Sequence, residues 1–183
     1  MLVLLVAFAL ADQPSKPVDW KAMISGIRDV LKNDPGSQGS VEEHYGIGIR
    51  NIADITGDGI TEALVYLGTG GASTDALTLM RIENDKPVPA MFTGRDGKPS
   101  SVGFLRGASV MHTDDVEMLP LEHAIYSIHY SFSGTHANGV QKVRECGGEA
   151  YKWNPQTKTF DYNRRLSDRL NRDYCKKVRE KWR

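Results

Sequence analysis

Hydrophobic positions along the chain follow two different periods, and the changes between them divide the sequence into a helix, a sheet and a second helix. From residue 18 to residue 33 apolar side chains recur every three or four positions, which is the spacing of one helix face. Asp19 is a candidate N-cap, and the run from Asn33 to Gly36 ends the helix. The apolar stripe comprises Trp20, Met23, Ile24, Ile27, Val30 and Leu31. A stripe of this kind predicts a helix that packs on a sheet.

Between residues 45 and 162 the pattern changes to short alternating runs separated by Gly, Pro, Asn and Asp. Alternation with a period of two predicts strands, and these separators predict tight turns. We expect about eight to ten strands in an antiparallel meander, because turn signals recur at roughly the 8–12-residue spacing of small β domains. The expected hairpins turn at residues 56–59 and at the segments ENDK, GTHANG and PQTK.

The period of a helix returns at residue 164 and continues to residue 182. Apolar side chains then recur every four positions, namely Leu166, Leu170, Tyr174, Val178 and Trp182. This pattern predicts a C-terminal helix whose apolar side lies on the sheet and whose charged side faces water. The sequence as a whole therefore predicts an α+β fold, in which an N-terminal and a C-terminal helix cover a mostly antiparallel sheet in a single domain from residue 12 to residue 183.

Composition supports one globular domain and narrows the range of partners. The chain has 183 residues, of which 40% are hydrophobic and 25% charged, and its 23 Lys plus Arg balance 23 Asp plus Glu. We therefore expect no nucleic-acid partner from the overall charge. The charge is uneven, however, because from Arg164 onward nine Lys or Arg face only three Asp or Glu, an excess of six. One functional hypothesis is thus a polyanion or lipid-surface binder that acts through this basic helix.

The first eleven residues, MLVLLVAFALA, are apolar and are followed at once by the polar run DQPSKP. Their length and their small-x-small ending are typical of a secretory signal peptide, and a buried N-terminal strand or helix is the alternative. They are too few to span a bilayer, which needs roughly 20 apolar residues. We therefore expect a secreted or periplasmic protein without a transmembrane segment.

Two cysteines, Cys146 and Cys175, agree with export, because an oxidising compartment allows them to pair. Neither lies in a Cys-x-x-Cys or Cys/His pattern that would indicate redox catalysis or zinc. We expect a disulfide that joins the predicted sheet to the C-terminal helix. Two buried free thiols are the alternative.

The segment DITGDGITE carries the clearest candidate for a metal site. The side chains of Asp54, Thr56, Asp58 and Glu62 and the carbonyl of Ile60 stand at alternate positions around a glycine turn. Calcium prefers six to eight hard oxygen ligands, and a glycine lets a short loop wrap around the ion. The competing interpretation is a tight hairpin turn in which the same side chains bond the amides of the loop.

This loop resembles the Asp-x-Asp-x-Asp-Gly-x-x-Asp loop of FG-GAP and VCBS-type β repeats, in which the loop joins two strands. The resemblance implies a structural calcium ion as cofactor. It covers only the loop and the residues next to it, and the chain departs from it at Thr56 and at Glu62. The rest of the chain resembles bacterial exported domains of unknown function.

The remaining motifs favour a binding protein over an enzyme. The segment GTGGAST lacks the lysine of a P-loop, and we expect it to be a loop in which Thr69, Ser73 and Thr74 form a binding rim. The chain contains no Gly-x-Ser-x-Gly, Ser-x-x-Lys or His-Glu-x-x-His pattern. We therefore expect a non-enzymatic binding or interaction module whose partner is an envelope protein or polysaccharide. The alternative is an envelope-polymer hydrolase that uses carboxylates the sequence cannot pair.

Overall fold

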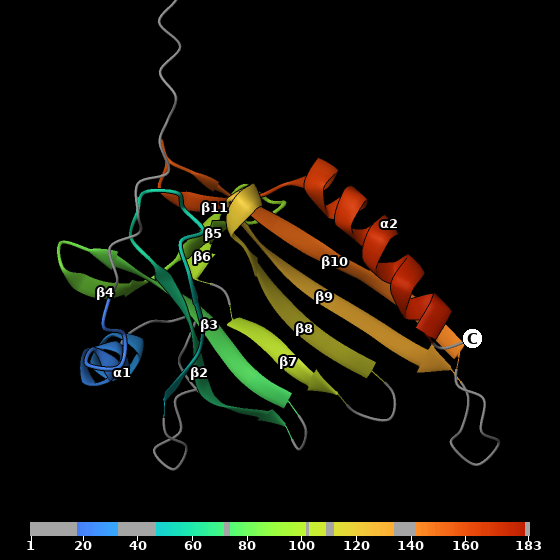
Figure 1. Cartoon of the computed structure of the whole chain (residues 1–183), viewed down its shortest axis with the longest axis horizontal. Coiled ribbons are helices and arrows are strands. Elements are labelled where there is room, and N and C mark those ends of the chain that lie inside the picture. The colour runs from blue at the N-terminus through green and yellow to red at the C-terminus, as the bar shows by residue number, and fades with distance from the viewer. Residues whose placement is uncertain are drawn as a thin grey trace, which may run out of the picture.

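The computed structural model of the chain describes residues 18–32, 47–71, 74–101, 103–108, 112–133 and 142–181. The predicted signal peptide lies outside these residues. Within them, eleven strands form one sheet, and two helices lie against it (Figure 1). The strands are β1 (Gly48–Ala53), β2 (Glu62–Gly71), β3 (Thr74–Glu83), β4 (Lys86–Pro89), β5 (Met91–Thr93), β6 (Pro99–Ser101), β7 (Gly103–Ala108), β8 (His112–Leu119), β9 (Ala124–Ser133), β10 (Lys142–Asn154) and β11 (Thr159–Tyr162), the helices are α1 (Ile24–Lys32) and α2 (Arg164–Lys181), and a 3₁₀ turn, η1, spans Pro120–Glu122.

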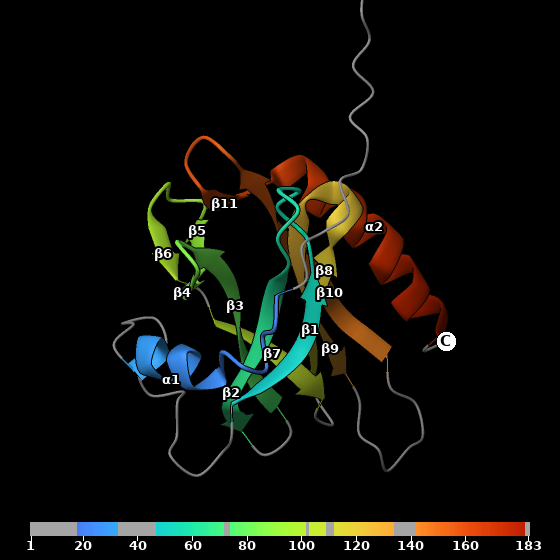
Figure 2. The same cartoon turned by 60° about the vertical axis from the view of Figure 1, so that its left-hand side comes forward.

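The sheet is strongly curved because strand β3 has a different neighbour along each half of its length. Its first half pairs with β7, and its second half pairs with β4. Strand β4 continues through Ala90 into β5, which pairs in parallel with β11 at the far end of the strand order. All the other pairings are antiparallel among the described strands. The end of the sheet formed by β5 and β6 therefore lies beside β4 and β3, as Figure 2 shows from the side.

The main hydrophobic core fills the inner side of this curved sheet. Phe92 lies at its centre, with ring centroids 5.3 Å from Phe104 and 5.4 Å from both Tyr151 and Phe160. Edge-on and offset contacts of this kind between aromatic rings add about 0.5–1.5 kcal/mol beyond the burial of their surface. The buried members of this core are Ile55, Leu64, Leu77, Leu79, Ala90, Phe92, Phe104, Val116, Met118, Ile125, Tyr151 and Phe160.

Helix α1 covers the outer face of β2 and β3. Its buried residues Ile27 and Leu31 pack with Trp20 against residues of these strands, which include Val65. The indole Nε1 of Trp20 also donates to the carbonyl of Thr61 at 3.2 Å. The regular helix begins at Ile24, later than the predicted residue 18, because residues 20–23 form a turn. The predicted cap, Asp19, serves this turn by accepting a hydrogen bond from the amide of Ala22 at 3.1 Å.

Helix α2 lies across the outer face of β9 and β10 (Figure 1). The hydroxyl of Ser167 accepts a hydrogen bond from the amide of Ala150 at 2.8 Å, and the hydroxyl of Tyr126 donates to Asn171 at 2.6 Å. A Cβ atom at Gly148 would lie 2.2 Å from the carbonyl oxygen of Ser127 and 2.7 Å from the Tyr126 ring. Glycine at this position therefore lets the Tyr126 ring lie on the backbone beneath the helix.

The predicted disulfide is confirmed. Cys146 of β10 and Cys175 of α2 are joined by an S–S bond of 2.03 Å, with their Cα atoms 5.7 Å apart. In the chain-entropy model the closure of a loop of this size stabilises the fold by about 3–4 kcal/mol. Neither helix that the structure describes is long and apolar enough to cross a membrane.

The predicted α+β class, both helices and the hairpins at residues 56–59, ENDK, GTHANG and PQTK are confirmed by the strand pairings, although the segment GTHANG itself lies outside the described residues. The count of eleven described strands exceeds the expected range by one. The parallel pairing of β5 with β11 was not predicted, and it is the contact that curves the sheet back on itself.

Candidate functional site

The loop between β1 and β2 holds four of the five predicted calcium ligands, the fifth, Glu62, begins β2, and the acidic side chains accept hydrogen bonds from the backbone of the loop. The two carboxylate oxygens of Asp54 accept hydrogen bonds from the amides of Gly57 at 2.7 Å and Gly59 at 3.0 Å. Asp58 accepts one from the amide of Ile60 at 2.8 Å. Gly57 and Gly59 have φ angles of 75° and 82°, in the left-handed region that favours glycine. These are the bonds and angles of a tight Asx-stabilised turn.

Glu62, the first residue of β2, is the most enclosed of the predicted ligands, with only 2% of the residue exposed. One carboxylate oxygen accepts hydrogen bonds from the amides of Ile55 at 2.9 Å and Thr56 at 3.2 Å. The other oxygen accepts a hydrogen bond from the Thr56 hydroxyl at 3.2 Å. Burial raises the pKa of the Glu62 carboxyl to about 7, and the charge of Asp58 adds to this, although the hydrogen bonds from Ile55 and Thr56 oppose it. Glu62 therefore acts as an internal brace of the loop.

These contacts agree with the turn interpretation, in which each carboxylate has a partner inside the loop. The hydroxyl of Thr56 likewise has its partner inside the loop, because it donates to Glu62 at 3.2 Å. Among the described residues, no group of three or more His, Cys, Asp or Glu side chains is arranged to hold a metal ion. Calcium binding by this loop stays a prediction.

The predicted binding rim is divided between two strands. Thr69 belongs to β2 and Thr74 to β3, and these strands pair as a hairpin. Ser73 lies outside the described residues, and the side chains of Thr69 and Thr74 are not described either. The expected loop is thus shorter than the segment GTGGAST.

A second region, the basic pocket, lies beside the first turns of α2 and has a volume of about 590 Å³. Its lining includes four cations, Lys152, Arg165, Arg169 and Arg172, and one acid, Glu122. Glu122 forms an ion pair with Arg169, with a distance of 2.7 Å between the carboxylate and Nη2. The other three cations have no ion pair within the part of the chain that the structure describes. The basic pocket is therefore strongly positive.

The start of α2 increases this positive potential. Asn163 caps the helix by accepting the amide of Leu166 at 2.9 Å, and the first turn contains Arg164 and Arg165 but no acidic residue. The N-terminal end of a helix carries roughly half a positive charge, so acidic residues are favoured there and arginines are not. The sequence thus places cations where they weaken the helix by a few tenths of a kcal/mol or more.

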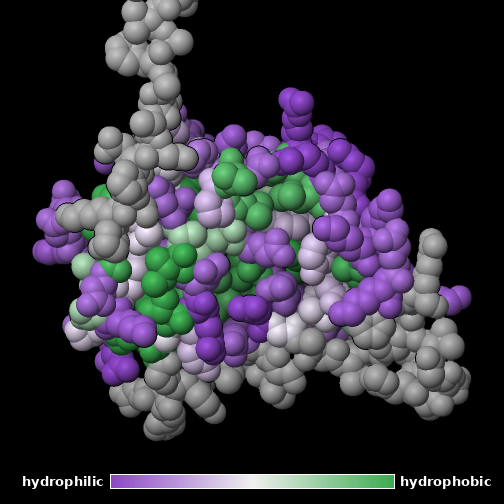
Figure 3. Space-filling view, viewed as in Figure 1, coloured by the Kyte–Doolittle hydropathy of each residue, from purple (hydrophilic) through white to green (hydrophobic). Residues whose placement is uncertain are grey.

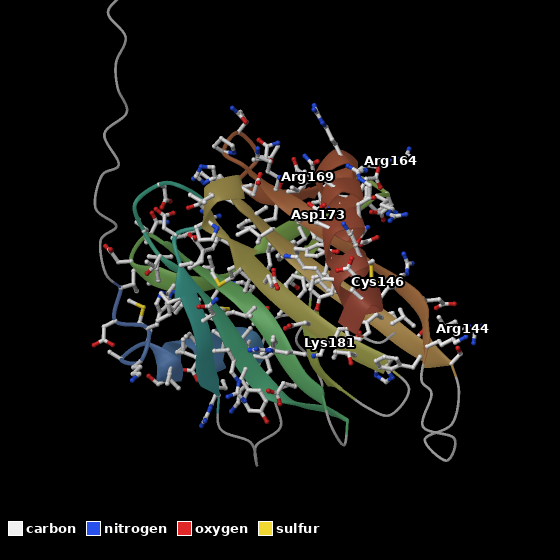
Figure 4. All side chains as sticks on the ribbon, turned by 45° about the vertical axis from the view of Figure 1, so that its right-hand side comes forward. Arg144, Cys146, Arg164, Arg169, Asp173 and Lys181 are labelled. Carbon is white, nitrogen blue, oxygen red and sulfur yellow. A yellow bond between two sulfur atoms is a disulfide. The ribbon has the colours of Figure 1, made fainter. Side chains whose placement is uncertain are left out.

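The rest of the basic face of α2 is exposed to solvent. Figure 3 shows a hydrophilic band over the helix. In Figure 4, Arg164 and Arg169 lie near one end of α2 and Lys181 near the other, with Cys146 beside the helix between them. The apolar side chains of the helix, such as Leu166, pack on β9 and β10. Any contact that this helix makes with a partner therefore uses its charged side and not its apolar stripe.

A third polar region lies on the opposite face of β9, and sequence reasoning did not find it. Asp114 lies between two histidines, with its carboxylate 2.7 Å from Nδ1 of His129 and 3.4 Å from Nε2 of His112. Glu149 accepts the hydroxyl of Tyr151 at 2.6 Å and pairs with Arg95 at 3.0 Å. A pocket of about 280 Å³ is lined by Ser127, His129, Glu149 and Tyr151, with Phe104 and two glycines.

This third region does not form the pair of facing acids that glycoside hydrolysis uses. Each carboxylate is held in a separate cluster, and of the two only Glu149 lines the pocket. Burial, followed by the hydrogen bond to Glu149, raises the pKa of Tyr151 well above its ordinary value. Tyr151 therefore stays protonated and acts as a donor that fixes the Glu149 carboxylate. Alternation along β9 and β10 was the available signal, but it does not reveal which strands become neighbours.

Comparison of the chain with models of protein families, with curated proteins and with solved structures finds no match. The physical basis for a function therefore lies in the sites themselves.

Proposed function

We propose that this protein is an exported, non-enzymatic binding module that recognises an anionic polysaccharide of the cell envelope through the basic pocket at the start of α2. The observation that carries the proposal is the charge of that pocket, where four cations meet only one carboxylate. Sulfate, phosphate and carboxylate groups are the ligands that such a cluster attracts. A bound anion would also oppose the unfavourable interaction of Arg165 with the helix dipole.

Export is supported by two separate features. The apolar segment MLVLLVAFALA is typical of a signal peptide, and the Cys146–Cys175 disulfide is typical of an oxidising compartment. The disulfide also anchors α2 to β10, which carries Lys152. It therefore keeps the cations from the helix and from the strand in one arrangement.

The experiment compares binding of dextran sulfate and of uncharged dextran, which have the same backbone. The test variant is Arg165→Glu with Arg172→Glu. The control is Lys176→Glu with Lys177→Glu, which makes the same change of charge on exposed positions of the same helix, outside the residues that line the basic pocket. We expect dextran sulfate alone to bind, with at least about a tenfold loss for the test variant and less than about a threefold loss for the control.

An equal loss in both variants would overturn the basic pocket as the site, because only the total charge would then matter. Equal binding of dextran would overturn recognition of charge. A further control is Leu121→Ser, in the turn that carries Glu122. Leu121 is 98% exposed, so its replacement should leave both folding and binding unchanged.

A further inference from the structure

A different pocket lies among three turns of the chain and holds a buried arginine. Its volume is about 370 Å³, within the range of small-molecule sites. Asp58 comes from the β1–β2 loop, Glu83 and Asn84 from the β3–β4 hairpin, and Lys158 from the β10–β11 hairpin. Figure 1 shows these three connections gathered at the same end of the sheet. None of these residues lines the basic pocket.

The arginine in question is Arg81, whose side chain is only 9% exposed. Its guanidinium lies over the ring of Trp153, 4.6 Å from the centroid. Nη1 donates to the carboxylate of Glu83 at 2.8 Å and to the carbonyl of Lys158 at 3.4 Å. Nε is buried and has no hydrogen-bond partner among the described residues. A buried donor without an acceptor destabilises a fold by about 1–3 kcal/mol, so this position calls for an acceptor.

The chemistry of the lining defines the acceptor. A carboxylate matches the fork of a guanidinium, and it can take two parallel hydrogen bonds from the edge that carries Nε. The exposed side chain of Lys158 adds a second positive charge at the rim. The Lys158 side chain is exposed and the Glu83 side chain is 41% exposed, so both can turn outward to make room for a ligand carboxylate beside the guanidinium of Arg81.

A residue of the opposite charge, Asp58, lines the same pocket. Asp58 is exposed and uses Oδ1 to accept a hydrogen bond from the amide of Ile60, and a carboxylate has further acceptor capacity on its second oxygen. Trp153, Pro155 and Ile82 add apolar surface to the lining. We propose that this pocket binds a free amino acid with an apolar side chain, with its carboxylate at Arg81 and Lys158 and its ammonium group at Asp58.

The test uses L-phenylalanine, N-acetyl-L-phenylalanine and L-phenylalanine amide as probes, and nuclear magnetic resonance of the protein as the readout. The N-acetyl probe lacks the ammonium group, and the amide probe lacks the carboxylate. We expect saturable binding of L-phenylalanine with a shift of the Arg81 Nε–H signal, weaker binding of the N-acetyl probe, and no shift of that signal with the amide. Absence of saturable binding by L-phenylalanine would overturn the proposal.

Two surface variants separate the charged groups without disturbing the buried arginine. Asp58→Asn keeps an oxygen for the amide of Ile60, and Lys158→Asn suits the left-handed backbone at this position, where φ is 56°. We expect Asp58→Asn to weaken L-phenylalanine about threefold and to leave the N-acetyl probe unchanged, while Lys158→Asn weakens both. Equal affinity of the parent protein for L-phenylalanine and its N-acetyl form would contradict the role of Asp58. Neither variant alters the basic pocket, so this test is independent of dextran sulfate binding.

Discussion

The acidic β1–β2 loop and the basic pocket at the start of α2 both concentrate charge, but they differ in how that charge is used. In the loop, the carboxylates of Asp54, Asp58 and Glu62 accept hydrogen bonds from the backbone of the loop itself. In the basic pocket, the one carboxylate pairs with only one of the four cations, Arg169. The loop therefore uses its polar groups to hold its own shape, whereas the basic pocket keeps an excess that an outside partner can neutralise.

The contrast between these two regions shows that the types of residue in a motif do not decide its role. The loop has the residue types of a calcium site and the hydrogen bonds of a turn. The basic pocket matches no motif, because its residues come from β10, η1 and α2. A binding site is distinguished by the charges and hydrogen-bonding groups that the fold leaves without a partner.

The largest expected effect is on stability, from Glu62→Ala. This change removes the acceptor for two amides and one hydroxyl in a buried place, and each unpaired donor costs about 1–3 kcal/mol. We expect the free energy of unfolding to fall by about 4 kcal/mol in denaturant titrations, with dextran sulfate binding of the folded protein unchanged. A loss below about 1 kcal/mol would mean that Glu62 does not brace the loop.

The next effect is a dependence of stability on pH. The pKa of Glu62 is about 7 in the folded protein, against an ordinary value of 4.5 for an exposed glutamate, so between these values the folded chain binds one more proton than the unfolded chain. Stability from this group is therefore fully present below about pH 4.5 and is lost as the pH rises to about 7, by roughly 3 kcal/mol in total. Glu62→Gln should remove this slope in unfolding curves measured across that range. An unchanged slope in the variant would assign it to other groups.

A smaller effect separates the two interpretations of the loop. If it bound calcium with the ~10⁻⁴ to 10⁻³ M dissociation constants of extracellular modules, about 1 mM calcium would stabilise the fold by about 0.4–1.4 kcal/mol. Because the carboxylates already bond the loop, we expect no measurable change in melting temperature, measured at about pH 8 so that Glu62 is ionised. Stabilisation that Asp58→Asn abolishes would instead support the calcium hypothesis.

The smallest effect is a gain of stability with a loss of binding. Arg165→Glu puts an acidic residue into the first turn of α2, where it interacts favourably with the helix dipole. We expect unfolding to become harder by about 0.3–1 kcal/mol while affinity for dextran sulfate falls. Arg179→Glu, in the last turn, should change stability in the opposite direction. Destabilisation by Arg165→Glu would show that this arginine serves the fold.

Local patterns in the sequence predicted most of the fold. The helices followed from apolar side chains repeated every three or four residues, and the hairpins followed from alternation between turn residues. The start of α1 was wrong by several residues because Trp20 is buried with the helix but belongs to a preceding turn. The pairing of Cys146 with Cys175 followed from composition and was confirmed.

Contacts between distant segments could not be predicted in this way. The parallel pairing of β5 with β11 joins residues more than sixty positions apart and involves a strand of only three residues, Met91–Thr93. The same applies to the contact of Arg81 with Trp153 and to the position of Lys152 and Arg165 in the lining of one pocket. The sequence did indicate the oxygen atoms of the β1–β2 loop, but not that Glu62 would turn inward. Burial depends on what packs over a residue, and periodicity within one segment does not contain that information.

The most direct test of the central claim is the dependence of dextran sulfate affinity on salt. Each ion pair formed with a polyanion releases counterions, so the logarithm of the affinity falls linearly with the logarithm of the salt concentration. We predict a steep slope for the parent protein, reduced by about two in Arg165→Glu with Arg172→Glu, one for each arginine. A slope near zero, or the same slope in both proteins, would contradict recognition of an anionic polymer by the basic pocket.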